Sequence, residues 1–331
     1  GLSLARGIVD NLAPIAYHYK GYTRKGGTLC APSFLHWETL LKTVAIFYQG
    51  RKEVTSEFAA KLAPMLQRRG YQVRTVNLLD EAEECSESSF RGCELVLVLG
   101  GDGTIVHAAR VCSCLNLPIV GINFGRVGFL TEIEPNEVET HLDYYLDSDP
   151  SVWVDKRTML NAALEQNGHT EEFLALNDVV IARGTWPRMV HVKIWIDDYF
   201  YNTTYSDGII ISTATGSTAY NMAAGGPLLH PQVQSSIITP IAPHLETDRS
   251  LIIPPEACIK LQIFTGTQDG IFSADGQINR EIKNEATIEV KKSPYVTKFL
   301  RRHPPTNFYH VITNKLKSTL STLPGDSHHD T

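Results

Sequence analysis

Glu94-Leu95-Val96-Leu97-Val98-Leu99-Gly100-Gly101-Asp102-Gly103-Thr104 is the stretch that decides the fold. Residues 94–99 predict a continuous apolar strand, and residues 105–114 predict a helix directly after the glycines. Glycines at the carboxyl end of a sheet strand let backbone N–H groups approach a phosphate, and the next helix adds its positive N-terminal end. The stretch therefore predicts a phosphate-binding loop in an α/β domain.

The flanking sequence repeats this strand-and-helix pattern. Strands are predicted at residues 44–48, 73–76 and 117–123, and helices follow from Val54 to Gly70 and over residues 136–146. Strands that are apolar on both faces and alternate with amphipathic helices are typical of a parallel sheet covered on both sides. We expect a Rossmann-like domain over residues 43–150.

The sequence pattern changes after Pro150. Short alternating and β-branched segments separated by turn residues predict a mostly antiparallel, β-rich domain over residues 151–298. A short helix is predicted over residues 308–316. Residues 1–42 are expected to be an extension, and the polar tail 318–331 is expected to be disordered. The strands predicted in the second domain are residues 160–165, 173–182, 190–196, 208–212, 259–264, 270–273 and 286–291.

Composition narrows the classes of function. The 331 residues suit two domains, and a net charge of −6 provides no basic field for nucleic acid or anionic membrane. Six cysteines without a Cys-x-x-Cys pair indicate a reducing compartment, and we expect the cytoplasm. No apolar run reaches the ~20 residues that span a bilayer. Residues 1–37 have the basic bias of organelle-targeting peptides, so targeting stays open beside an extension.

Asp102 is the one side chain of the glycine loop that accepts a proton, which predicts a general base toward a hydroxyl that attacks a phosphoryl group. The alternative is a tight turn in which Asp102 or Thr104 caps the helix. The loop matches neither the P-loop pattern nor the dinucleotide fingerprint, because Val106 occupies the last glycine position of the latter.

A second motif runs from Tyr205-Ser206-Asp207-Gly208 through the strand 209–211 to Ser212-Thr213-Ala214-Thr215-Gly216-Ser217-Thr218-Ala219-Tyr220, and on to Gly225-Gly226-Pro227. Small hydroxylated residues around glycine predict a surface that a flat ring approaches closely, with hydroxyl and backbone partners for its edge. The alternative is a Ser/Thr-rich turn with a helix cap.

Together, and in this order, the two motifs resemble the NAD kinase family over residues 43–316. Residues 121–130, Asn177-Asp178 and Ala274-Asp275-Gly276-Gln277 resemble it as well. The glycine-aspartate loop is shared with diacylglycerol-type and sphingosine-type lipid kinases, whereas the stretch from Asp207 to Pro227 is specific to NAD kinases. This sequence departs from the family in having Ala214 in place of the usual proline.

The resemblance implies a Rossmann-like domain joined to a β-rich domain, with residues 299–317 returning to the first. It also implies that Asp102 takes the proton of the 2'-hydroxyl of the adenosine ribose of NAD. The ligand-binding residues that it implies are Gly101, Gly103 and His107 near the phosphates; Phe129 beside the adenine; Asn177 and Asp178 on the ribose of the nicotinamide half; Thr215, Thr218, Ala219 and Tyr220 around a nucleoside; Arg188, Tyr205 and Gln277 as further contacts; and Asp207 on the nicotinamide carboxamide, often from a neighbouring subunit.

The implied product is NADP, and the donor is ATP or polyphosphate carrying a divalent cation, with magnesium expected. No metal cage of the protein's own is expected, and family members are dimers or tetramers. NAD against NADH preference stays open. Two alternatives are a lipid kinase, which would need an apolar pocket for acyl chains, and a non-catalytic dinucleotide-binding protein, which would not need Asp102.

Overall fold

The computed structural model describes residues 42–78, 87–126, 128–184, 188–245 and 248–321. The predicted extension, apart from Lys42, and residues 322–331 of the predicted tail lie outside the described residues. Within the described part, none of the helices combines the length and apolarity that crossing a membrane requires.

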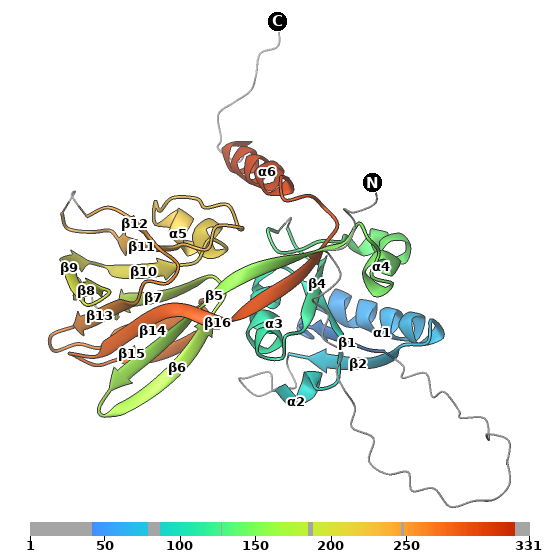
Figure 1. The fold of residues 1–331 in the computed structure, drawn as a ribbon, viewed down its shortest axis with the longest axis horizontal. Helices are drawn as coiled ribbons and strands as arrows, with labels where there is room; N and C mark the ends of the chain where they lie inside the picture. Colours follow the sequence, from blue (N-terminus) through green and yellow to red (C-terminus); the bar gives the residue numbers. More distant parts are fainter. Residues whose placement is uncertain (1–41, 79–86, 127, 185–187, 246–247, 322–331) are drawn as a thin grey trace, which may run out of the picture. The chain divides into compact units, whose positions relative to one another are not determined.

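The first half of the described chain is the predicted parallel α/β unit (Figure 1). Its strands lie in the order β2-β1-β3-β4, and every residue of β3 is buried. Its elements are β1 (Thr43–Tyr48), α1 (Glu53–Arg68), β2 (Gln72–Asn77), α2 (Glu87–Phe90), β3 (Leu95–Gly100), α3 (Asp102–Cys114), β4 (Pro118–Asn123), η1 (Pro135–Glu137) and α4 (Val138–Leu146).

Alternate residues of these strands pack against helices on opposite faces of the sheet. Val96 and Val98 of β3 join a core cluster with α3, whereas Leu97 and Leu99 join a cluster with α1 and α4. This two-sided burial explains why the strands are apolar throughout. The predicted Rossmann-like fold class is confirmed.

The second half is a sandwich of antiparallel strands. One layer contains β5 (Trp153–Gln166), β6 (His169–Ala175), β8 (Val190–Ile196), β9 (Tyr199–Ser206), β13 (Ile259–Phe264) and β16 (Thr287–Arg301). The other contains β7 (Asp178–Arg183), β10 (Gly208–Ser212), β11 (Ser236–Ile241), β12 (Leu251–Ile253), β14 (Gly270–Ala274) and β15 (Ile278–Ile282). A single apolar cluster with residues from both layers forms the core. The predicted antiparallel character is confirmed.

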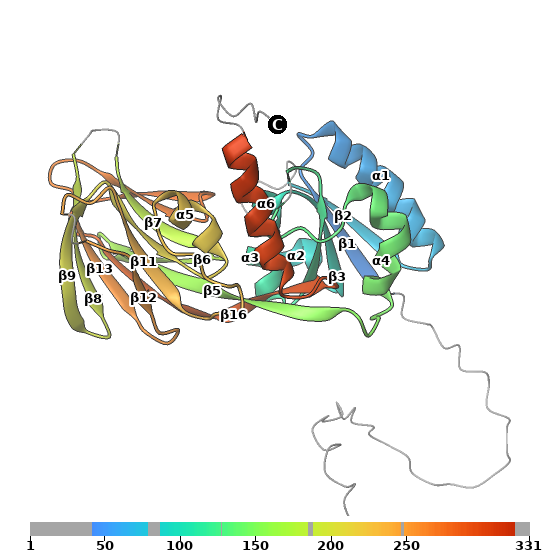
Figure 2. The same cartoon turned by 90° about the horizontal axis from the view of Figure 1, so that it is seen from above.

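One strand joins the two halves, whereas the resemblance implied only that residues 299–317 return to the first. β16 pairs with β5 and β13 and then, in parallel, with β4 through Lys298↔Pro118 and Phe299↔Ile119. A ten-stranded sheet therefore runs through both predicted domains, and the boundary predicted at residue 298 falls inside a strand. After β16 the chain enters α6 (Asn307–Ser321), so the tail predicted from Ser318 begins within a helix (Figure 2).

Three local predictions were wrong. Residues 173–182 are two strands in different sheets, because the chain bends between Ala175 and Asp178. α3 begins at Asp102 and not near Ile105. The strands β9, β11, β12 and β15 were missed. β9 and β15 are largely exposed, β12 has three residues, and Pro240 interrupts the apolar run of the buried β11.

Candidate active site

Asp102 is the first residue of α3, and its carboxylate points away from the helix cap. Phe129 N donates to Asp102 Oδ2 at 2.9 Å, and Leu130 N donates to Oδ1 at 3.0 Å. Gly101 is the N-cap, and no side chain caps the helix, so the capping role considered for Asp102 or Thr104 is not observed. A carboxylate has about four acceptor positions, so each oxygen keeps capacity for a further hydrogen bond.

Gly128 permits this arrangement. A side chain at Gly128 would overlap Asp102 Oδ1, whereas a Cβ at Gly101 or Gly103 would meet nothing within 4 Å. The segment 128–130 therefore lies directly against the carboxylate, while the glycines on the other side of it leave open space. Space beside a helix N-terminus suits an anionic ligand.

The Ser/Thr-rich motif packs against Asn177. Thr213 N donates to Asn177 O at 2.9 Å, Thr213 Oγ1 donates to Leu176 O at 2.6 Å, and a Cβ at Gly216 would overlap Asn177 O. Ser217 Oγ donates to Ala214 O at 2.7 Å. The buried hydroxyls of Thr213 and Ser217 thus bond to backbone carbonyls, as in the turn considered as the alternative. Partly exposed Thr218 and Ala219, in η2 (Gly216–Thr218) and directly before α5 (Tyr220–Ala223), remain accessible, as does Tyr220.

Asp275 organises the site from the β14–β15 turn. Its fully buried carboxylate accepts hydrogen bonds from the amides of Leu176, Asn177 and Asp178 at 3.0, 2.7 and 3.2 Å. These bonds hold the bend that separates β6 from β7. Burial raises the pKa of Asp275, although the amides and Arg110 of α3 oppose that rise.

The same turn contacts the glycine loop. Gln277 Nε2 donates to Gly103 O at 2.8 Å, and Gln277 Oε1 accepts from Arg110 Nη1 at 2.9 Å. These hydrogen bonds join the β-rich half to the residue after Asp102. The two motifs are therefore parts of one site.

Asp178 is a buried acid in this site. It is 4% exposed, and its side chain accepts no hydrogen bond from any residue that the structure describes. Burial, and then the charge of Asp275, raise the pKa of Asp178 to about 7. It can therefore carry a proton near neutral pH and donate a hydrogen bond.

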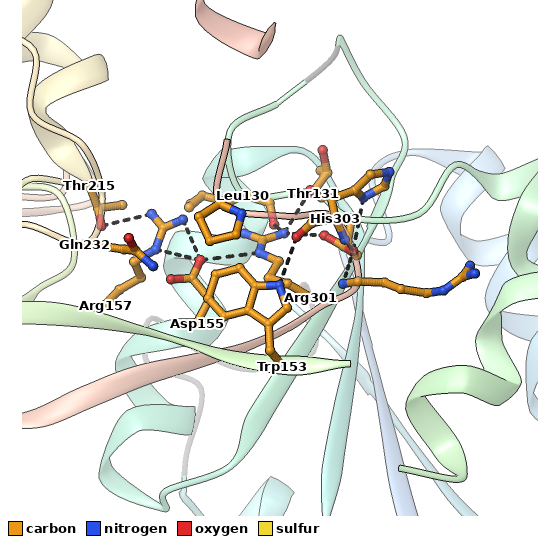
Figure 3. Close-up of polar contacts among 12 residues, drawn as sticks. Leu130, Thr131, Trp153, Asp155, Arg157, Thr215, Gln232, Arg301 and His303 are labelled. Carbon is orange, nitrogen blue, oxygen red and sulfur yellow. Dashed lines mark hydrogen bonds and ion pairs between the residues drawn. The ribbon is translucent and has the colours of Figure 1, made fainter. Parts of the chain in front are cut away.

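Two buried arginines line a cavity of about 70 Å³ beside Gly128 and Phe129. Arg157 donates to Asp155 Oδ2 through Nε at 2.8 Å and to Thr215 Oγ1 through Nη1 at 3.3 Å (Figure 3). Arg301 Nη1 donates to the carbonyl of Leu130 at 2.9 Å. The arginines therefore link the Ser/Thr-rich motif to the segment that holds Asp102.

Comparison with known proteins identifies this arrangement. Models of the ATP-NAD kinase N-terminal and C-terminal domains match residues 37–149 and 176–302. The NAD kinase of Thermoanaerobacter sp. (strain X514) is 39% identical over 238 residues, which are 72% of this chain and 83% of that protein. The chain belongs to the ATP-NAD kinase family.

Other ATP-NAD kinase relatives extend the match. The NAD kinase of Dehalococcoides mccartyi (strain CBDB1) is 34% identical over 282 residues, which cover 84% of this chain and 97% of that protein. The crystal structure of yeast NADH kinase complexed with NADH has a TM-score of 0.75 at 23% identity, covering 88% of this chain and 92% of that one. This likeness shows that the fold is the same.

The structure of this ATP-NAD kinase family member brings part of the predicted site together. Asp102, Gly103, Gln277, Asn177 and Asp178 are connected through the hydrogen bonds of Asp102, Gln277 and Asp275. Phe129 lies 6.1 Å from Phe308 of α6 between ring centroids, with Lys315 Nζ 4.3 Å from the centre of its ring. Thr215 is 7% exposed and is held by Arg157.

Other predicted residues lie elsewhere in the same chain. Asp207 pairs with Arg183 at 2.8 Å. Arg183 is the last residue of β7 and Asp178 is the first, and a strand of this length separates its two ends by ~17 Å. Tyr205 stacks on His191 with centroids 4.3 Å apart. Arg188 is exposed just before β8.

His107 lies on α3, four residues after Gly103. Its ring stacks on Phe47 at 5.9 Å, and Nδ1 lies 3.3 Å from Arg110 Nη2. It lines a separate cavity with Arg110 and Glu171. Its position near the phosphates stays a prediction.

Sequence reasoning missed the residues that organise the site. Asp275 was part of a matching motif without a role, and its left-handed φ of 54°, followed by Gly276 at 66°, marks the tight turn. Arg110, Arg157 and Arg301 gave no signal, because their partners are distant in sequence. The Asp-Gly pair at the turn was the one available clue.

Proposed function

We propose that this chain transfers the terminal phosphoryl group of ATP to the 2'-hydroxyl of the adenosine ribose of NAD, with Asp102 as the general base. The observation that carries this proposal is the carboxylate of Asp102, fixed by two backbone amides beside a glycine loop that Gln277 contacts from the other half. The exposed side of the Asp102 carboxylate is accessible to a hydroxyl. The two hydrogen bonds to its oxygens fix the direction from which that hydroxyl approaches.

In this reaction Asp102 accepts the hydroxyl proton while the ribose oxygen forms a bond to the γ-phosphorus. The bond from that phosphorus to the bridging oxygen breaks, and ADP leaves with the electron pair. The N-terminus of α3, which begins at Asp102, stabilises the negative charge of the phosphates.

Magnesium is proposed to arrive on the phosphates of the donor, as part of the substrate. Among the described residues, no three or more His, Cys, Asp or Glu side chains group in a way that would hold a metal ion. Mg²⁺ commonly keeps several waters and binds through substrate phosphates.

The dinucleotide is proposed to lie across the two halves. The side-chain amide of Asn177, unlike its backbone N–H, makes no hydrogen bond with the residues that the structure describes, so it can serve the ribose of the nicotinamide half. The carboxyl group of Asp178 can donate a hydrogen bond to the same ribose when protonated, or accept one when ionised. Thr218, Ala219 and Tyr220 frame a nucleoside on the accessible face of the Ser/Thr-rich motif.

A homo-oligomer is part of this proposal. Asp207 pairs with Arg183 at the far end of β7 from Asp178, and Tyr205 lies two residues before it. We propose that these residues, with Arg188, reach a dinucleotide bound in the site of a second copy. The edge strand β9 supports such an arrangement, because Tyr199 and Phe200 expose 76% and 49% of their surface. We further propose a cytoplasmic location, which suits the four free cysteines of the described residues.

The experiment is an assay of purified protein with NAD, ATP and magnesium chloride, scored for NADP by an NADP-specific dehydrogenase. Tripolyphosphate replaces ATP in a second arm, NADH replaces NAD in a third, and diacylglycerol replaces NAD in a fourth. NADP formation in the first arm is the expected result. Lipid phosphorylation that exceeds NAD phosphorylation would instead favour the lipid kinase.

A further inference from the structure

We propose that the cavity between Arg157 and Arg301 is a binding subsite for a phosphate group, and that the terminal phosphate of the phosphoryl donor occupies it. The inference rests on the proposed function and assigns a place to the donor. Neither arginine belongs to the two sequence motifs.

Two buried guanidinium groups line the cavity. Arg157 and Arg301 are each 7% exposed at the side chain, and both interact with the same oxygen of Asp155 (Figure 3). The distances to Asp155 Oδ2 are 2.6 Å from Arg157 Nη2 and 3.5 Å from Arg301 Nε. Asp155 therefore pairs with both guanidinium groups, and Arg301 is also paired with Glu132.

Glu132, the second acid of the cavity wall, already accepts several hydrogen bonds. Glu132 accepts hydrogen bonds from Tyr145 Oη at 3.0 Å, Arg302 N at 2.8 Å and Arg301 Nη1 at 3.1 Å. It also lies 3.1 Å from His303 Nδ1. These contacts include Arg301 but not Arg157. Asp155 and Glu132 are the only acids that line the cavity among the described residues.

One nitrogen of Arg301 lacks a partner. Its Nη1 donates to Leu130 O and Thr131 O, both at 2.9 Å, whereas the buried Nη2 has no hydrogen-bond partner among the described residues. A buried unpaired donor destabilises a protein by about 1–3 kcal/mol, and more when it is charged. The guanidinium fork matches phosphate oxygens, so a bound phosphate would supply what this nitrogen lacks.

The size and position of the cavity fit the donor. Its volume is about 70 Å³. One water needs about 10–15 Å³ on this measure, so there is room for roughly five atoms, the number in a phosphate group. Gly128 lines the cavity and also abuts the carboxylate of Asp102. The neutral donors Gln232 and Asn307 complete the wall.

The test separates phosphate binding from catalysis. Titration calorimetry measures the binding of tripolyphosphate, of inorganic phosphate and, separately, of NAD. The variants are Arg157→Lys, which keeps the charge and loses the fork, and Val311→Trp, which fills the cavity from α6 and leaves both arginines unchanged. Arg280→Met is the control, because Arg280 pairs with Glu171 elsewhere.

We expect both cavity variants to weaken tripolyphosphate binding by about 10- to 100-fold, the loss typical of hydrogen bonds to a charged group, with NAD affinity kept within about twofold. The KM for ATP should rise in parallel. Phosphate binding alone, with an unchanged KM for ATP, would assign the cavity to free phosphate and overturn the donor assignment. Unchanged tripolyphosphate binding in Val311→Trp would overturn the subsite itself. A wild-type protein that binds tripolyphosphate here but makes no NADP would refute the proposed function and not the subsite.

Discussion

Asp102 and Arg301 are joined through one residue, Leu130. The N–H of Leu130 donates to Asp102 Oδ1 at 3.0 Å, and its carbonyl accepts from Arg301 Nη1 at 2.9 Å. Because Arg301 ends β16, the strand that runs through both halves also fixes the segment that holds the proposed base. The position of Asp102 therefore depends on the last strand of the chain.

Asp102→Asn should lower turnover by about 100- to 10,000-fold, because the amide cannot take the hydroxyl proton. NAD affinity should change little, since the side chain keeps its shape. Steady-state rates and calorimetric titration of NAD check the two parts. Asp143→Asn, at an exposed acid of α4, is the control and should keep full turnover. Near-normal turnover in Asp102→Asn would rule out the assigned base.

Gly128→Ala should destabilise the protein by about 1–3 kcal/mol and reduce turnover, because the new methyl group overlaps the carboxylate of Asp102. Gly101→Ala is the matched comparison, since a Cβ there meets nothing within 4 Å. It should keep the melting temperature and weaken nucleotide binding, because phosphates need that space. Equal melting temperatures for both variants would contradict the close packing at Gly128.

Asn177→Ala should weaken NAD binding by ~0.5–3 kcal/mol, the range for lost hydrogen bonds that differ in burial and charge. The fold should be kept, because the backbone N–H and carbonyl of Asn177, and not its side chain, bond to Asp275 and Thr213. Calorimetric titration of NAD measures the loss, with Asn279→Ala on the exposed β15 as the control. Identical NAD affinities would remove Asn177 from the binding site.

The free energy of unfolding should fall as pH rises from about 4 to about 7, because of the raised pKa of Asp178. Its pKa is about 7 in the folded protein, against an ordinary value of 3.8, so the folded state holds a proton that the unfolded state releases in this window. Stability is lost with rising pH wherever the folded state binds more protons. Urea unfolding at pH 5 and pH 8 measures the difference. Asp178→Asn should reduce the difference in stability between the two pH values. An unchanged pH dependence in that variant would contradict the raised pKa of Asp178.

The pair of His303 and Glu132 should act in the same direction. The hydrogen bond to Glu132 raises the pKa of His303, so the charged pair stabilises the protein fully below the unfolded pKa of ~6.5 and is lost as pH rises through the folded value. His303→Gln should therefore lower the melting temperature at pH 6 and leave it unchanged at pH 8.5. His244→Gln, at an exposed histidine, is the control for the loss of an imidazole.

Local pattern alone determined much of this protein. The run from Leu95 to Gly100 is buried on both faces, and the glycines after it meet the N-terminus of α3 as expected. Strand β10 has the predicted bounds, Gly208–Ser212. Such elements can be predicted from sequence, because periodic burial and turn chemistry depend on neighbours a few residues away.

Tertiary structure decided how these elements form a site. Asp102 is held by amides 27 and 28 residues away, Asp275 holds the chain 97 to 99 residues away, and Arg301 reaches Leu130 across 171 residues. Which amide or carboxylate meets a given side chain depends on which strands become neighbours, and β16 joins β4 only in the folded sheet. A single arginine or aspartate has no periodicity that records such a partner, so the sequence predicted the base but not what positions it.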